Sequence, residues 1–260
     1  MKLNIVPART GLQWVKLGLQ TFSRQPLALA GLFFMYAAAA TLLSVLPFIG
    51  LVLALAIVPG ATLGLMAATR EAMTGKFPMP TVLVTAFRAG KQRLRGMLVL
   101  GFLYAAACLA VMALVGLLVE VPQASAPTTP QSMMTPQFQM ALLLGSVLYL
   151  PVSLMFWHAP ALVHWYGISP LKSLFFSTVA CLRNAKALLM FGLGWAAIIF
   201  VASLLIGLLA LVTGSPQFAA AALMPLGLVI TAMFSTSLYF TFRDSFEPAP
   251  DAPALPGDLP

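Results

Sequence analysis

The stretch PLALAGLFFMYAAAATLLSVLPFIGLVLALAIVPGATLGLMAAT, residues 26–69, decides the fold because it contains no charged residue. A helix that crosses a bilayer needs about 20 consecutive, mostly apolar residues. The stretch is too long for one such helix and suits two, near residues 27–46 and 50–69, joined by the turn LPFIG at residues 46–50. We therefore predict a hairpin of two membrane-spanning helices.

Four further windows contain no Asp, Glu, Lys or Arg, and they lie near residues 97–119, 140–162, 187–212 and 218–242. One such charge at the centre of a span would cost about 3 kcal/mol. The whole chain is 61% hydrophobic and only 8% charged, whereas a soluble domain carries about 25% charged residues. The sequence thus predicts an all-α membrane protein with six transmembrane helices and excludes a water-soluble fold.

The 14 Lys and Arg residues predict the orientation of these helices. All of them precede the first span, follow the sixth, or lie between spans two and three or four and five. Basic residues concentrate on the cytoplasmic side of membrane proteins. We therefore expect both termini in the cytoplasm, without a cleaved signal peptide.

Two segments are rich in proline and polar residues. The outer connection EVPQASAPTTPQSMMTPQFQ, residues 120–139, is predicted to be an exposed flexible loop. The ending DSFEPAPDAPALPGDLP is predicted to be a disordered, acidic cytoplasmic tail. The chain then divides into a transmembrane domain at residues 1–243 and a tail at residues 244–260.

A weak internal similarity predicts a threefold repeat. TAFRAGK at residues 85–91 resembles ACLRNAK at residues 180–186, and each precedes a predicted span. We interpret the chain as three units, each an amphipathic interfacial helix followed by a hairpin of two spans. In the first unit Leu12, Val15, Leu19 and Phe22 form one apolar helical face, with Trp14 at its edge.

Cations flank the apolar faces of the first two interfacial segments. The candidates for contact with anionic lipid are Lys16, Arg24, Arg88, Lys91 and Arg95. Two interpretations remain open: these helices only anchor the bundle, or they form a specific site for a lipid headgroup. Membrane lipids are the expected partners, and binding to nucleic acid is not expected because the basic residues are spread over several short loops.

His158 is the titratable residue of note within a predicted span. It lies in FWHAPALVHWYG, residues 156–167, near the predicted cytoplasmic end of the fourth span. His164 is six residues away, so the two rings do not share a helical face, and no acid or cysteine neighbours them. A structural role in an aromatic belt and a functional role of His158 both remain open, and no metal or cofactor is predicted.

Small residues and prolines mark the even-numbered spans. Pro59, Pro151 and Pro225 should kink their helices, which either lines a cavity or curves the helices around their neighbours. Gly60 and Gly64 form a GxxxG pair that suits close packing, either within the chain or between subunits.

Three segments resemble a family of uncharacterised proteobacterial polytopic inner-membrane proteins. They are VPARTGLQWVKLGLQTF at residues 6–22, PLALAGLFFMY at residues 26–36 and ATREAMTGKFPMPTVLVTAFRAG at residues 68–90. The resemblance implies a location in the bacterial inner membrane and assigns no activity, ligand or functional residue.

Because the spans lack charge and the sequence has no catalytic motif, we do not expect an enzyme. The first expectation is a membrane scaffold or accessory subunit with a membrane-protein partner, or with itself as a homo-oligomer. The alternative is a permease or lipid-handling channel without ion coupling.

Overall fold

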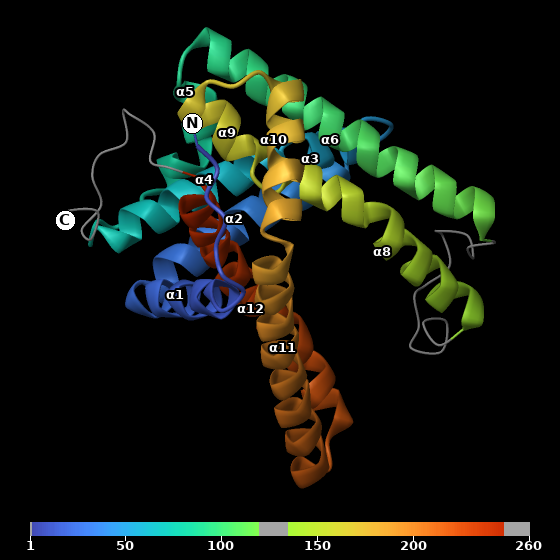
Figure 1. The fold of residues 1–260 in the computed structure, drawn as a ribbon. Coiled ribbons are helices and arrows are strands. Elements are labelled where there is room, and N and C mark those ends of the chain that lie inside the picture. Colours follow the sequence, from blue (N-terminus) through green and yellow to red (C-terminus); the bar gives the residue numbers. More distant parts are fainter. Residues whose placement is uncertain (1, 120–134, 247–260) are drawn as a thin grey trace.

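A computed structural model of the chain describes residues 2–119 and 135–246, and over these residues the fold is helical (Figure 1). The helices are α1 (Thr10–Arg24), α2 (Pro26–Ser44), α3 (Gly50–Ala56), α4 (Val58–Met73), the short 3-10 helix η1 (Pro80–Val84), α5 (Thr85–Arg88), α6 (Lys91–Leu118), α8 (Pro136–Phe156), α9 (Ala159–Tyr166), α10 (Pro170–Arg183), α11 (Ala185–Thr213) and α12 (Pro216–Ser245). The predicted all-α class is confirmed.

Six segments are long and apolar enough to cross a membrane, which confirms the predicted number. They are Pro26–Ser44, Gly50–Met73, Lys91–Leu118, Pro136–Tyr166, Ala185–Thr213 and Ala221–Ser245. The second segment consists of α3 and α4, and the fourth of α8 and α9. The third begins six residues before its predicted window, because the helix continues through the basic turn that starts at Lys91.

Proline positions explain the interruptions. Pro59 lies in the first turn of α4 and Pro160 in the first turn of α9, where a missing N–H costs no helical hydrogen bond. Pro151 and Pro225 lie inside α8 and α12. The break between α8 and α9 falls at Trp157 and His158, within the window predicted as one span, because the proline ring at 160 clashes with the preceding turn.

The predicted outer loop is shorter than expected at its second end. Thr135 caps α8 by accepting a hydrogen bond from the N–H of Phe138 at 3.3 Å, and Pro136 occupies the first turn. Residues 135–139 therefore belong to the cap and first turn of α8. Residues 120–134 of the predicted loop lie outside the described residues.

The predicted boundary at residue 244 also differs from the structure. Helix α12 continues to Ser245, and Leu3 and the buried Phe246 form an antiparallel backbone bridge. The first residues of the predicted tail are therefore ordered, because Asp244 and Ser245 have hydrogen-bond partners in the fold. The remainder, residues 247–260, lies outside the described residues.

The hairpins share one packed end and diverge from it. In Figure 1, α11 and α12 run together toward the bottom of the view, whereas α6 and α8 run toward the right. Buried side chains gather where the hairpins meet, in a main core that includes Trp14, Leu162, Phe191 and Phe240. We call this packed end, with α1, η1, α5 and α10, the basic end, because the Lys and Arg residues of the described chain lie on or beside these elements.

Helix α1 uses its apolar face to pack on protein. Its buried residues include Trp14, Val15 and Phe22, and it lies against α11 and α12. Trp14, predicted at the edge of the face, is fully buried, whereas Leu12 is exposed. Trp14 is therefore central to the buried face and not at its edge, because α11 and α12 cover that side of α1. The place of Leu12 on an apolar face toward lipid stays a prediction.

The GxxxG pair packs within the chain. A Cβ added to Gly60 would meet the ring of Phe87 at 2.7 Å, and one added to Gly64 would meet the backbone of Leu83 at the same distance. Both glycines thus allow η1 and α5 to approach α4 closely. Of the two interpretations left open, the structure supports contact within the chain.

Candidate functional site

The five predicted lipid contacts are exposed at the basic end and come from three helices. Lys16 and Arg24 lie on α1, Arg88 ends α5, and Lys91 and Arg95 lie in the first turns of α6. The structure does not gather these five into one site. Arg95 lines one groove together with Arg93, a residue that the sequence analysis did not single out.

His158 lies in an aromatic enclosure instead of an open cavity. Its side chain is only 1% exposed. Its ring centroid lies 5.4 Å from that of Phe246 and 5.9 Å from that of Phe242. Nδ1 is buried and has no hydrogen-bond partner among the described residues. This environment holds an imidazole without presenting it to a solvent-filled path.

The backbone at His158 is held by a side chain from another helix. The hydroxyl of Ser177 on α10 accepts the N–H of His158 at 2.9 Å and donates to the carbonyl of Leu154 at 2.8 Å. An uninterrupted α-helix would join these two backbone groups directly, since they lie four residues apart. Ser177 therefore bridges the break between α8 and α9 and satisfies both groups.

Cys181 lies one turn further along α10 and contacts the same carbonyl. Its Sγ is 3.7 Å from the oxygen of Leu154. Burial raises the pKa of the Cys181 thiol to about 12, although its side-chain hydrogen bond with Ser177 acts in the opposite direction. A buried, neutral thiol is a poor nucleophile, so Cys181 acts here as a packing residue.

A buried asparagine ties the two ends of the described chain together. The side chain of Asn184, between α10 and α11, accepts the N–H of Val6 at 2.9 Å. Its amide nitrogen donates to the carbonyl of Asn4 at 3.0 Å and to the hydroxyl of Ser245 at 3.3 Å. Three segments far apart in the sequence thus converge on one amide, which is 2% exposed.

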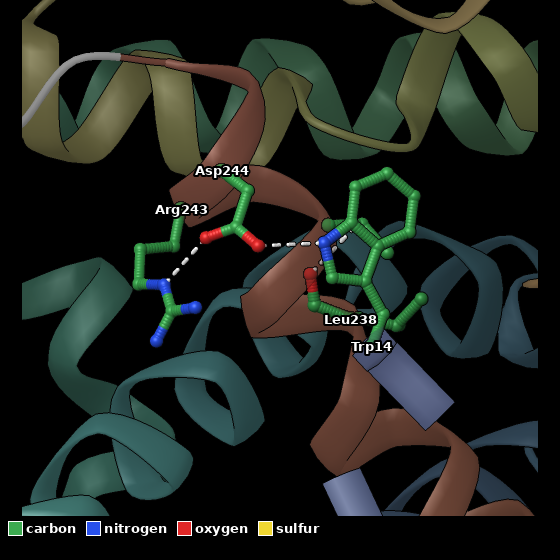
Figure 2. Close-up of polar contacts among 5 residues, drawn as sticks. Trp14, Leu238, Arg243 and Asp244 are labelled. Atoms are coloured by element: carbon green, nitrogen blue, oxygen red, sulfur yellow. Dashed lines mark hydrogen bonds and ion pairs between the residues drawn. The ribbon is translucent and has the colours of Figure 1, made fainter. Parts of the chain in front are cut away.

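A second link joins α1 to the end of α12 (Figure 2). The indole Nε1 of Trp14 donates to a carboxylate oxygen of Asp244 at 2.8 Å, and Nε of Arg243 donates to the other oxygen at 2.7 Å. The Arg243 guanidinium also lies 5.0 Å from the ring centroid of Phe240. Both oxygens of Asp244 are therefore engaged, and the carboxylate fixes α1 against α12.

Arg93 and Arg95 line a groove of about 490 Å³ at the basic end. One wall is the start of α6, with Gln92, Gly96 and Val99, and the other is the connection from α9 to α10. The residues that line the groove on this second side are Val163, Gly167, Ile168, Ser169, Pro170 and Leu171. In Figure 1 this connection passes over the upper end of the molecule, beside the first turns of α6. The groove combines cationic and apolar lining, which suits an amphiphilic anion.

The sequence analysis missed Ser177 and Asn184. Each depends on a partner far away in the sequence: 23 residues for Ser177 to Leu154, and 180 for Asn184 to Asn4. A signal for Ser177 did exist, because Pro160 predicts a break whose free backbone groups need a partner. In the part of the chain that the structure describes, no three His, Cys, Asp or Glu side chains gather in a way that could hold a metal.

The chain is 38% identical over 265 aligned residues to a protein of Burkholderia thailandensis whose description is "probable inner membrane protein". The alignment covers 98% of each of the two chains. No protein-family profile and no solved structure matches the chain.

Proposed function

Because the chain belongs to the same family as the probable inner membrane protein of Burkholderia thailandensis, we propose that it is a non-enzymatic scaffold or accessory subunit of the inner membrane. In this role the basic end forms a rigid platform, and the diverging hairpins offer apolar helix faces to partner helices. The partner is another membrane protein or a second copy of this chain.

The observation that carries the proposal is the exposure of the diverging hairpins. In α11, no residue beyond Trp195 is buried, and Phe200, Leu204 and Leu208 are all more than half exposed. In α8, only Val152 and Phe156 are buried. Lipid alone could cover these faces, but apolar spans that contact their own chain so little also leave room for partner helices.

We propose that both termini face the cytoplasm. Support comes from the grouping of cations at the basic end. The bridge between Leu3 and Phe246 also fits this arrangement, since it holds the two ends of the described chain together. Alkaline phosphatase fused after residue 260 should be inactive and a fluorescent protein at that position bright; an active phosphatase would contradict the orientation.

We also propose that the chain is a threefold repeat of an interfacial helix and a hairpin. The order of helices supports this, because α1, the η1–α5 segment and α10 each precede a pair of spans. The exposed Lys16 and Arg24, together with the buried Trp14, Val15 and Phe22, support an amphipathic character for α1. The function of the repeat would be to present three hairpins from one platform.

Native mass spectrometry of the protein, released gently from its own membrane, tests the scaffold role. A photoreactive residue at Leu204 of α11 should crosslink to the same stoichiometric partner that the mass identifies, whereas one at the buried Trp195 should not. A monomer without partner, with only lipid crosslinked at Leu204, would contradict the proposal.

A permease or lipid-handling channel without ion coupling is the second candidate. The groove beside Arg93 and Arg95 favours it, because its lining suits an amphiphilic anion. Liposomes with the purified protein should then move a fluorescent anionic lipid between leaflets faster than protein-free liposomes. Equal rates in the two preparations would leave the scaffold role as the proposal.

A further inference from the structure

We propose that the groove between the first turns of α6 and the α9–α10 connection binds one anionic phospholipid, with the headgroup phosphate between Arg93 and Arg95. The inference deepens the second candidate function and, for the choice of leaflet, rests on the proposed orientation. The five predicted lipid contacts are spread over three helices, whereas this site is a single groove whose lining residues are known.

Charge complementarity is the first argument. Arg93 and Arg95 are two residues apart, and both contribute to the lining. The acids of the described chain are Glu71 and Asp244, neither of which lines the groove, and Asp244 is already paired with Arg243. No ion pair neutralises either arginine within residues 2–119 and 135–246. The guanidinium groups are therefore available to a phosphate, which arginine binds through two parallel hydrogen bonds.

Two helix ends add to this positive potential. The groove is lined by residues from the first turns of α6 and α10, helices of 28 and 14 residues. Neither N-terminus has a side-chain cap. Backbone N–H groups in a first helical turn have no partner within the helix, and the helix dipole favours an anion there.

The apolar lining distinguishes a lipid from a soluble phosphate. Val99 of α6 and Leu171 of α10 both line the groove, and Leu171 is 70% exposed. On α6, the exposed Phe102 lies one turn beyond Val99, and on α10 the exposed Phe175 lies one turn beyond Leu171. Acyl chains that leave the groove would follow these two apolar strips, whereas a free phosphate would leave them uncovered.

The size of the groove fits this occupant. Its volume of about 490 Å³ lies within the range of about 300–1,000 Å³ in which small-molecule sites fall. Gly96 lets α6 pack closely on α9 beside the groove, because a Cβ at this position would meet a methyl group of Val163 at 3.1 Å. A headgroup with the upper part of its chains fills such a space, and the rest of the lipid stays in the bilayer.

The test is native mass spectrometry of the full chain from nanodiscs that contain phosphatidylglycerol and phosphatidylcholine. We expect the wild-type protein to retain one phosphatidylglycerol. The Arg93→Gln/Arg95→Gln variant should bind it about 30-fold more weakly, since each basic residue contributes about fivefold at a membrane surface. The matched control Lys16→Gln/Arg24→Gln removes the same charge from α1 and should retain the lipid.

Further variants keep the test decisive. The Arg93→Lys/Arg95→Lys variant preserves the charge but not the bidentate geometry, and should show an intermediate affinity. It also serves if the glutamine variant fails to fold. Competition with glycerol 3-phosphate and with inorganic phosphate separates the lipid from soluble phosphate compounds, which should not displace it at equal concentration.

Three outcomes would overturn the inference. The first is an equal loss of phosphatidylglycerol from the Arg93→Gln/Arg95→Gln and Lys16→Gln/Arg24→Gln variants. The second is that the wild-type protein retains phosphatidylcholine as well as it retains phosphatidylglycerol. The third is that glycerol 3-phosphate binds as tightly as phosphatidylglycerol. A nanodisc offers the same lipids to both faces of the protein, so the result does not depend on the orientation. Failure of the proposed topology is therefore distinguishable from failure of this site.

Discussion

The hydroxyl of Ser177 on α10 accepts the backbone N–H of His158 at 2.9 Å, at the point where the fourth span breaks. The same hydroxyl donates to the carbonyl of Leu154, so that one side chain replaces a missing helical hydrogen bond. This contact joins α10 to the fourth span in the packed core. His158 is the N-cap residue of α9, with φ −109° and ψ −13°.

We expect Ser177→Ala to lower the free energy of unfolding by about 1–3 kcal/mol, because two buried backbone groups lose their partner. Thermal unfolding in detergent checks this. Ser203→Ala is the matched control, since Ser203 is exposed and bonds only to the carbonyl of Ile199 in its own helix. Equal midpoints for the two variants would show that the bridge contributes nothing to stability.

We expect Trp14→Phe to destabilise the protein by about 1.5–3 kcal/mol, the range for hydrogen bonds to charged groups. Trp195→Phe is the matched control, because Trp195 is also buried but its Nε1 has no hydrogen-bond partner in the described part of the chain. Combining Trp14→Phe with Asp244→Asn in a double-mutant cycle isolates the pair. Additive effects in that cycle would refute the coupling between α1 and α12.

A third prediction concerns the closeness of α1 and α11. A Cβ on Gly11 would collide with the carbonyl oxygen of Ala187, so Gly11→Ala must push the two backbones apart. We expect a loss of about 1–3 kcal/mol, as for other overpacked sites. Gly207→Ala on α11 has open space around it and should be neutral or slightly stabilising. A stability of Gly11→Ala equal to that of the control would contradict this packing.

The fourth prediction is the inertness of Cys181 toward thiol reagents. With a pKa of about 12, the thiol stays neutral as the pH rises from about 7 to about 9, and thiolate is the reactive form. In a Cys108→Ala background, maleimide should label the protein only after unfolding, at either pH. An added Ser23→Cys, at an exposed position of α1, should react at once. Rapid labelling of the folded Cys181 would show that the core at α10 opens.

Residue composition determined the class and number of the spans. Whether about 20 consecutive residues lack charge can be read directly from the chain. This property identifies a span because the bilayer core contains no water to solvate a charge. The six windows could therefore be located before any contact was known. Their ends were less certain, since caps such as Thr135 and breaks such as the one before Pro160 depend on individual residues.

Only the tertiary structure decided what the faces of these helices touch. Helical periodicity placed Trp14 at the edge of an apolar stripe, but the position of α11 and α12 buries it and gives its indole Asp244 as partner. In the same way, Arg93 and Leu171 belong to one groove only because α6 and the α9–α10 connection meet there. A pattern along the chain defines which side of a helix is apolar or charged. Which distant segment meets that side follows from packing in three dimensions. This packing supplies the partners of Ser177 and Asn184 and the groove around Arg93.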